Sequence, residues 1–228
     1  MEVGAAGGGG RRIKLRIFEV ASWLWFIITA TVAQTQNTTD PAEARVIHDM
    51  FRQWGIEESK VANMRWNLSG ELCSGAAVDS TPYDSQAYNP GIKCDCSFPN
   101  STCHITRLRV YSLDVEGPIP EGLWTLVYLT NLGIGTNSFN GSLPSELGNL
   151  RRLEQLYIDS SGVGGEIPST FANLQNLVTV WASDNEFTGR IPDFIGNWTQ
   201  LESLRFEGNS FEGSIPPSFS RLTSLQEL

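Results

Sequence analysis

Three large side chains of the types that dominate protein binding sites recur at a spacing of 24 residues: Tyr157, Trp181 and Arg205. Tyrosine, tryptophan and arginine contribute much of the binding energy at protein interfaces. Two residues after the first and the last of them stand carboxylate acceptors, Asp159 and Glu207. If the 24-residue spacing reflects a structural repeat, these side chains form one surface suited to binding a ligand.

The two series extend toward the N-terminus at the same spacing. One series reads Arg109, Gly133, Tyr157, Trp181 and Arg205, and the other reads Tyr111, Gly135, Asp159, Ser183 and Glu207. The ligand-binding residues that we predict are Arg109, Tyr111, Tyr157, Asp159, Trp181, Arg205 and Glu207. The alternative is that Tyr157 and Trp181 only pack on each other and shield strand edges.

Catalysis has no support in the residue pattern. The sequence contains no Gly-rich phosphate loop and none of the V-A-I-K, H-R-D or D-F-G motifs of kinases, so kinase activity cannot reside in these residues. Its carboxylates are scattered, and the two histidines, His48 and His104, have no partner at a ligand spacing. We therefore predict a binding protein with no catalytic residue and no cofactor.

Four cysteines could form a metal site or two disulfide bonds. Cys73, Cys94, Cys96 and Cys103 all precede the region of 24-residue repeats. Four cysteines can hold a tetrahedral zinc ion, but the Cys-x-x-Cys pair typical of such sites is missing. The spacing favours two disulfide bonds in an oxidising compartment, and we predict no metal.

The spacing itself identifies the elements that position these residues. A Gly-x-[Ile/Leu]-Pro tetrad returns every 24 residues, with its prolines at positions 120, 144, 168, 192 and 216. Between the tetrads runs the pattern L-x-x-L-x-x-L-x-[LIVF]-x-x-N, clearest at residues 129–137 and 201–209. This pattern is a leucine-rich repeat, whose copies stack into a solenoid because no single turn can bury its own apolar residues.

Four further columns at the same step predict the interior of the coil. Two apolar columns belong to the strands, a third apolar column follows them, and a fourth is mostly asparagine, whose amide can pair buried backbone groups. The four columns are Leu108, Leu132, Leu156, Val180 and Leu204; Val110, Ile134, Ile158, Ala182 and Phe206; Val115, Phe139, Val163, Phe187 and Phe211; and Leu113, Asn137, Ser161, Asn185 and Asn209. Because Leu113 and Ser161 interrupt the asparagine column, we expect looser turns there.

The expected fold is an α/β leucine-rich-repeat solenoid, a right-handed coil with short parallel strands on its concave face. Residues 105–228 would form five repeats and a truncated sixth that ends at Leu228. Because side chains alternate between the two faces of a strand, we expect the series from Arg109 to Arg205 and the series from Tyr111 to Glu207 to point toward solvent on the concave face. In the last turn we expect four apolar side chains to be exposed and the chain to fray: Phe206, Phe211, Phe219 and Leu222.

The N-terminal region reads as a secretory signal over residues 1–33. Four basic residues between positions 11 and 16 precede an apolar run from about Val20 to Val32, followed by small residues. A membrane anchor is the alternative, but a run of some 13 residues is shorter than the roughly 20 that span a bilayer. Five N-glycosylation sequons also indicate secretion: Asn37, Asn67, Asn100, Asn140 and Asn197.

Acidity excludes one class of partner. The net charge of the chain is −9, and because the predicted signal carries four basic and two acidic residues, the remainder carries −11. Nucleic acid is therefore a poor partner. The charge is typical of an acidic extracellular protein and would suit a basic ligand.

A helical cap is predicted between the signal and the repeats, within residues 34–104. Asp40 is a typical N-cap residue, Pro41 suits the first helical position, and Glu43 lies in the first turn. An apolar face then recurs at helical spacing to about Trp54, and Gly55 suits the C-terminal end. This face would cover the first turn of the solenoid.

The combined motifs resemble the extracellular part of plant leucine-rich-repeat receptor-like serine/threonine kinases. The resemblance is carried by the Gly-x-Ile-Pro repeat, the cap helix, the segments 66–75 and 121–126, and Cys94-Asp95-Cys96. It is greatest for the subfamily in which a malectin-like domain, a membrane helix and a cytoplasmic kinase follow the repeats. The segment from Cys96 to Cys103 has the spacing found in the cap of such proteins. This spacing, with the poor geometry of a Cys94–Cys96 bridge, predicts the pairs Cys96–Cys103 and Cys73–Cys94.

The resemblance implies an extracellular region that binds a peptide, a protein or a cell-wall glycan, with a co-receptor as a further partner. Attachment to the plasma membrane would depend on a C-terminal span beyond Leu228. The alternative is a secreted protein of the apoplast that inhibits an enzyme or acts as a decoy.

Overall fold

The computed structural model describes residues 37–57, 70–83 and 89–228. The predicted signal over residues 1–33 and the sequon at Asn67 lie outside the described residues.

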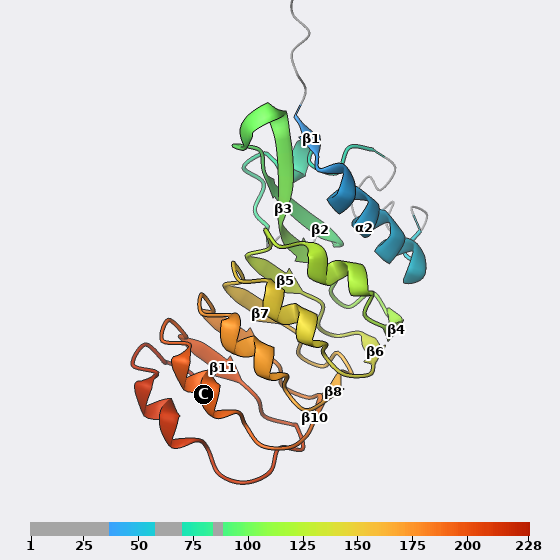
Figure 1. Ribbon diagram of the computed structural model, residues 1–228. Helices are drawn as coiled ribbons and strands as arrows, with labels where there is room; N and C mark the ends of the chain where they lie inside the picture. The colour runs from blue at the N-terminus through green and yellow to red at the C-terminus, as the bar shows by residue number, and fades with distance from the viewer. Residues whose placement is uncertain (1–36, 58–69, 84–88) are drawn as a thin grey trace, which may run out of the picture. The chain divides into compact units, whose positions relative to one another are not determined.

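One main sheet runs through the cap and the repeats. It contains β1 (Thr38–Thr39), β3 (Thr102–Arg109), β5 (Asn131–Gly133), β7 (Gln155–Tyr157), β9 (Thr179–Trp181) and β11 (Ser203–Arg205), in that order and all parallel, and β2 (Gly91–Asp95) pairs antiparallel with β3. Successive repeat strands pair exactly one period apart, as in Leu132 with Leu156 and Leu156 with Val180. Strands β3, β5, β7 and β11 lie one above another in Figure 1.

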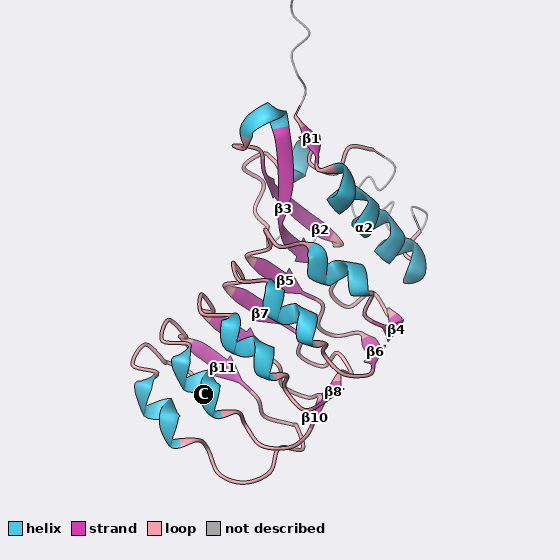
Figure 2. Cartoon of the chain, viewed as in Figure 1, coloured by secondary structure: helices cyan, strands magenta, loops and turns pink. Residues whose placement is uncertain are grey.

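The opposite side of the coil consists of short helical turns (Figure 2). Proline is the N-cap residue of each 3-10 helix in the repeats, because its fixed φ suits the entry to a helix while the preceding chain stays extended. These helices are η4 (Glu121–Thr125), η5 (Ser145–Asn149), η6 (Ser169–Asn173), η7 (Asp193–Asn197) and η8 (Pro217–Arg221). Two small parallel sheets precede them: β4 (Glu116–Pro118) with β6 (Ser138–Asn140), and β8 (Gly164–Gly165) with β10 (Glu186–Phe187).

The apolar columns form the core as predicted. All members of the first column are buried, and the other two apolar columns are buried except for Phe206 and Phe211 in the last full turn, which are half-buried. Phe219 is also half-buried. The expectation for Leu222 was wrong: it is only 6 % exposed, because it closes η8 and packs into the core cluster.

The asparagine column pairs buried backbone groups between successive turns. Asn185 Nδ2 donates to three backbone carbonyl groups at 2.8 to 3.1 Å, and its Oδ1 accepts from the backbone N–H groups of Ser161 and Gly162, both at 3.0 Å. Asn137 and Asn209 make equivalent bonds.

The two turns without asparagine follow a different backbone path. Around Leu113 and around Ser161, two residues have a positive φ: Ser112 and Asp114, and Ser160 and Gly162. The turns at Asn137, Asn185 and Asn209 contain one such residue each. Left-handed backbone costs energy outside glycine, so the lost asparagine changes the turn.

The cap begins with helix α2 (Pro41–Gln53), which has the predicted ends. The Asp40 side chain accepts hydrogen bonds from the N–H groups of Ala42 and Glu43, and Gly55 has a φ of 61°. Ile47, Met50, Phe51 and Trp54 are buried in the common core. The apolar face of the helix therefore covers the first turn of the solenoid. Without this cover, the apolar residues of that turn would be exposed to water and the turn would be less stable.

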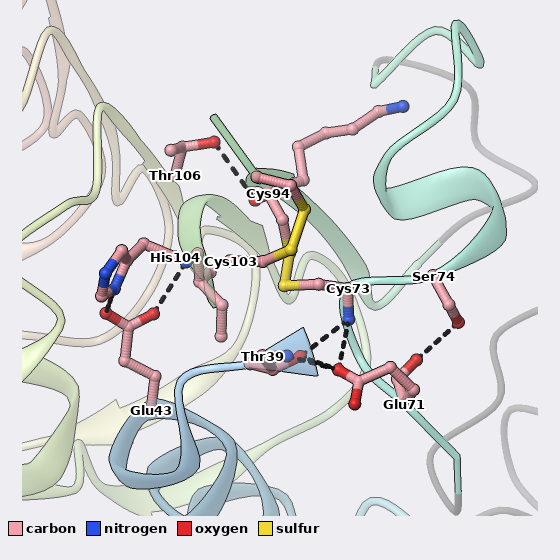
Figure 3. The surroundings of a disulfide bond; sticks show 12 residues. Thr39, Glu43, Glu71, Cys73, Ser74, Cys94, Cys103, His104 and Thr106 are labelled. Carbon is pink, nitrogen blue, oxygen red and sulfur yellow. Dashed lines mark hydrogen bonds and ion pairs between the residues drawn. A yellow bond between two sulfur atoms is a disulfide. The ribbon is translucent and has the colours of Figure 1, made fainter. Parts of the chain in front are cut away.

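Glu43 does not close a capping box but joins the helix to the sheet. Its Oε2 accepts from the N–H of Ile105 at 2.7 Å, and its Oε1 lies 2.7 Å from Nδ1 of His104 (Figure 3). His104 also stacks on Tyr128 with ring centroids 3.8 Å apart. His104 thus has a structural role at the junction of cap and repeats.

The disulfide bonds connect Cys73 to Cys94 and Cys96 to Cys103, which confirms the predicted pairing. Beside the first bond, the carboxylate of Glu71 accepts from the N–H groups of Thr39 and Cys73 at 2.7 and 3.3 Å (Figure 3). The short helices η2 (Gly75–Ala77) and η3 (Pro99–Ser101) complete the cap. The first disulfide ties β2 to the loop before η2, and the second ties the segment after β2 to β3. Both stabilise a cap that is too small to depend on its core alone.

Candidate functional site: the groove on the strand face

The repeat register assembles the first of the two predicted series. Arg109 pairs with Gly133, Gly133 with Tyr157, Tyr157 with Trp181, and Trp181 with Arg205 in successive parallel strands. Their neighbours in sequence at 108, 132, 156, 180 and 204 are buried. Alternation therefore points the series away from the core, onto the surface that we call the strand face.

A groove of about 770 Å³ lies on this face. It contains five of the seven predicted ligand-binding residues: Arg109, Tyr111, Tyr157, Asp159 and Trp181. It is completed by residues that the sequence analysis did not select: Tyr83, Asn89, Ser112, Asn131 and Gly133. Asn131 could have been found, because it belongs to a third outward series at a step of 24, whereas no local signal identifies Tyr83 and Asn89.

The two remaining predicted residues lie elsewhere. Arg205 and Glu207 line a separate hollow of about 530 Å³ near the C-terminal end of the described chain. The Nη2 atom of Arg205 lies 2.6 Å from a carboxylate oxygen of Glu227. Arg205 still contributes to the groove indirectly, because its guanidinium carbon lies 4.0 Å from the ring centroid of Trp181.

Tyr157 and Trp181 form one wall of the groove. Their rings meet edge to face with centroids 5.0 Å apart. The indole Nε1 of Trp181 donates to Oγ of Ser203 at 2.9 Å, and Ser203 donates to Glu227 at 2.8 Å. These contacts hold the indole ring in one orientation, which lowers the entropy that a ligand must remove on binding.

The cap provides the opposite wall. The guanidinium carbon of Arg109 lies 5.3 Å from the ring centroid of Tyr83, within the range of a cation–π contact. Asn89 accepts from the backbone N–H of Tyr111 at 3.0 Å and donates to the Tyr111 carbonyl group. Tyr111 is 41 % exposed. Cap and first repeat together therefore present two tyrosines and an arginine to the groove.

Glycines on β5 and just after it make the floor low. A Cβ atom at Gly133 would lie 3.7 Å from Cγ of Arg109 and 3.9 Å from Cβ of Tyr157, which are ordinary contacts. A Cβ atom at Gly135 would lie 2.8 Å from the backbone oxygen of Asp159, which real side chains do not tolerate. Gly135 is thus required by packing, whereas a Cβ atom at Gly133 would fit between its neighbours.

Asp159 and Asn131, two of the residues that line the groove, carry acceptor oxygens. Burial is the largest cause that raises the pKa of Asp159, and its own backbone N–H and Arg205 only partly offset it, while Asp184 adds to the rise. Asn131 is 4 % exposed; its Nδ2 donates to Gln155, but no donor in the described part of the chain reaches its Oδ1. Because the Asn131 oxygen is buried, of these two groups only the half-buried carboxylate of Asp159 can accept a hydrogen bond from a ligand in the groove.

The described residues also bear on metal binding, membrane spanning and glycosylation. Residues 37–57, 70–83 and 89–228 contain no cluster of three or more His, Cys, Asp or Glu residues that could hold a metal ion. In the same part of the chain, no helix has the length and apolar character needed to cross a bilayer. The described sequon residues Asn37, Asn100, Asn140 and Asn197 are all exposed, and none of them lines the groove.

Comparisons with known proteins place the repeats in a family. Residues 93–228 match the family model of a leucine-rich repeat region. The chain is 54 % identical over 116 residues to a probable LRR receptor-like serine/threonine-protein kinase of Arabidopsis thaliana, an alignment that covers 47 % of this chain and 11 % of that relative. This match covers only a small part of the relative, so it says nothing of the relative's other domains in this chain.

Two solved structures show the same repeat architecture. One is the Arabidopsis receptor kinase HAESA in complex with the peptide hormone IDA and the co-receptor SERK1, with a TM-score of 0.52, 31 % identity, and coverage of 53 % of this chain and 20 % of that chain. The other is the LRR ectodomain of the Arabidopsis receptor kinase SOBIR1, with a TM-score of 0.65, 21 % identity, and coverage of 82 % and 90 %. The second supports the fold alone. The chain belongs to the leucine-rich repeat family, and its repeats are similar to those of plant receptor-kinase ectodomains.

Proposed function

We propose that this chain is the extracellular ligand-binding region of a plant receptor-like kinase and that it recognises a peptide, a protein or a glycan in the groove on the strand face. The observation that carries the proposal is the groove itself. It has two aromatic walls from different parts of the chain, a glycine on its floor and the half-buried carboxylate of Asp159. A concave site with aromatic walls and a few convergent polar groups is the usual form of a ligand site.

Mutual packing of Tyr157 and Trp181 does not account for this arrangement. The two rings meet edge to face, yet both residues also line the groove. Trp181 is further held by Ser203 and Arg205. Fixed aromatic residues beside an open groove favour binding over simple shielding of strand edges.

The relatives support the kind of partner. The HAESA complex contains a peptide hormone and a co-receptor, and the curated relative is a receptor-like kinase. By analogy, this chain would lie outside the plasma membrane, bind a ligand from the apoplast and engage a co-receptor. Exposed sequons outside the groove are compatible with glycans that leave the binding surface open.

The test is ligand capture by the full chain secreted from plant cells. Immobilised protein is exposed to peptide, protein and glycan fractions of apoplastic fluid, and affinity for the retained ligand is measured for the original chain and for Tyr157→Ala and Trp181→Ala. We expect one of the two variants to lose about 2 kcal/mol of binding free energy, the size of an interface hot spot.

Arg151→Ala is the matched control. Arg151 is exposed, and within the described part of the chain only its backbone atoms make hydrogen bonds, so its loss should leave affinity unchanged. Circular dichroism establishes that the variants stay folded. Unchanged affinity in both aromatic variants, or no retained ligand in any fraction, contradicts the proposal.

A further inference from the structure

An aromatic cluster lies where the β2–β3 hairpin of the cap meets the repeats. The ring of Phe98, in the loop that joins β2 to β3, stands nearly perpendicular to the rings of His104 and Tyr128, with centroids 4.7 and 5.2 Å away. His104 and Tyr128 stack on each other, and the guanidinium carbon of Arg152 lies 4.7 Å from the ring centroid of Tyr128. Phe98 is half-buried, so part of this residue is open to a group outside the fold.

The chain turns sharply just after Phe98, within the loop that the Cys96–Cys103 disulfide closes. Asn100 and Ser101 have φ angles of 65° and 57°. These angles lie in the left-handed region, which costs energy outside glycine and costs least for asparagine. Because such a backbone persists only where its surroundings hold it, a further contact at this turn would stabilise the folded protein.

Among the sequons of this chain, the one at Asn100 is placed to supply that contact. Asn100 is exposed, and Phe98 precedes it by two residues. The first sugar of an N-linked glycan is bonded to Nδ2 of the asparagine, so its ring lies within one side-chain length of the turn. In the other four sequons the residue two positions earlier is not aromatic: Thr35, Arg65, Ser138 and Ile195.

The first sugar, N-acetylglucosamine, has a chemistry that suits an aromatic ring. The C–H groups on one face of its pyranose ring carry partial positive charge, and the face of an aromatic ring carries partial negative charge. Contact between them also removes apolar area of the phenylalanine from water. The hydroxyl groups at the rim of the sugar stay hydrated, so the contact leaves no polar group unpaired.

We propose that Asn100 is glycosylated and that its first N-acetylglucosamine packs on Phe98, so that the glycan becomes part of the junction between cap and repeats. In the transfer reaction, Nδ2 of Asn100 forms a bond to C1 of the sugar, and the bond from C1 to the pyrophosphate of a lipid-linked oligosaccharide breaks. The lipid pyrophosphate leaves with the electron pair of that bond, and Nδ2 loses one proton. The contact requires that the chain enters the secretory pathway, but it does not depend on the proposed ligand groove.

Two glycosidases distinguish the first sugar from the rest of the glycan. The full chain is secreted from plant cells treated with an inhibitor of mannosidase I, which keeps the glycans in their high-mannose form. Endoglycosidase H then leaves a single N-acetylglucosamine on each glycosylated asparagine, whereas peptide N-glycosidase F removes the whole glycan and converts the asparagine to an aspartate. Mass spectrometry of the peptide that contains Asn100 establishes that the residue was glycosylated and which product it carries.

Amide exchange over residues 96–104 measures the stability of the turn in the two products. We expect exchange to be about two- to tenfold faster after complete removal of the glycan than in the product that keeps the first sugar, a factor that corresponds to one aromatic contact. Phe98→Leu keeps an apolar side chain without the ring, so the difference should disappear, whereas Phe98→Tyr should retain it. The conversion to aspartate occurs in every variant and therefore cancels in this comparison.

Residues 193–202 around Asn197 are the control within the same molecule. Ile195, two positions before this sequon residue, is buried and not aromatic, so the two products should exchange equally there. Circular dichroism establishes that each variant is folded.

A secreted chain without a glycan at Asn100 overturns the inference, as does a difference in exchange that persists in folded Phe98→Leu. Equal exchange over residues 96–104 in the two products of the original chain overturns it even if a variant fails to fold. None of these results bears on the groove, whose test is ligand binding by the variants of Tyr157 and Trp181.

Discussion

At the scale of single residues, Asp159 in the groove lowers the stability of the folded protein. Its pKa is raised above the ordinary 3.8, chiefly by burial, so the folded protein holds this proton more tightly than the unfolded chain does. The resulting stabilisation is complete below pH 3.8 and is lost as pH rises through the folded-state pKa. At neutral pH the charged carboxylate is therefore a net burden.

Asp159→Asn should make the folded protein more stable than the original chain at neutral pH. The difference should shrink as pH falls through the raised pKa and vanish below pH 3.8, where both side chains are neutral. Urea unfolding midpoints at a series of pH values measure this. A difference that grows toward acid pH has the wrong sign and rules out the burial argument.

Glu71 provides the control of opposite sign. Burial alone would raise its pKa, but hydrogen bonds from Thr39 and Cys73 outweigh burial and lower the pKa below 4.5. This carboxylate stabilises the fold above pH 4.5 and ceases to do so as pH falls through the lowered pKa. Glu71→Gln should therefore destabilise the protein at neutral pH, with a penalty that declines in acid.

At the scale of the element, each asparagine turn depends on one amide. Asn185 pairs backbone groups of two successive turns and is buried. Asn185→Ala leaves these groups without partners, and we expect the free energy of unfolding to fall by about 2 to 4 kcal/mol. Urea denaturation measures the loss.

Asn176→Ala is the comparison for this variant. Asn176 is exposed and its amide makes one bond, to the Arg151 carbonyl at 2.8 Å, so its loss should stay within about 0.5 kcal/mol. Equal effects of the two substitutions would mean that the inward asparagine is not what holds the turn together.

Among the elements, α2 shows which features follow from nearby residues and which depend on contacts with distant residues. Its start at Pro41 and its cap at Asp40 follow from side chains within one turn, and both were predictable. The hydrogen bonds of Glu43 could not be predicted, because its partners His104 and Ile105 lie 61 and 62 residues away. Residue spacing carries no information on such a contact.

Over the whole molecule, stability should follow the stacking order of the turns. Strand β7 has strand neighbours on both sides, whereas β11 pairs with β9 and makes only an isolated bridge to Glu227 on its other side. In a solenoid each turn is stabilised by its neighbours. We expect amide exchange of this chain to be slowest in β5 to β9 and faster over residues 203–228.

Hydrogen exchange followed by mass spectrometry resolves these segments. Leu222 serves as the reference because it is buried although it lies in the last turn. If burial alone slowed amide exchange, the region around Leu222 would be protected as well as the central strands. Protection over residues 203–228 equal to that of β7 would show that the last turn does not depend on a further neighbour.

The sequence by itself determined the coil, its period and its register. Every pairing between repeat strands of the main sheet joins residues 24 apart, because one apolar side chain per turn at each column can be buried only in that alignment. The same alternation placed Tyr157 and Trp181 on one face. The disulfide pairs were also accessible, from spacing and resemblance.

Only the tertiary structure decided the limits of the groove. Tyr83 and Asn89 come from the cap, and no periodic signal connects them with Tyr111 or Arg109. Arg205 was predicted at the ligand surface, but its guanidinium pairs with Glu227 and lines a different hollow. The physical reason is that a repeat pattern specifies which side chains share a face, whereas the partner that each side chain takes depends on contacts between segments far apart in the chain.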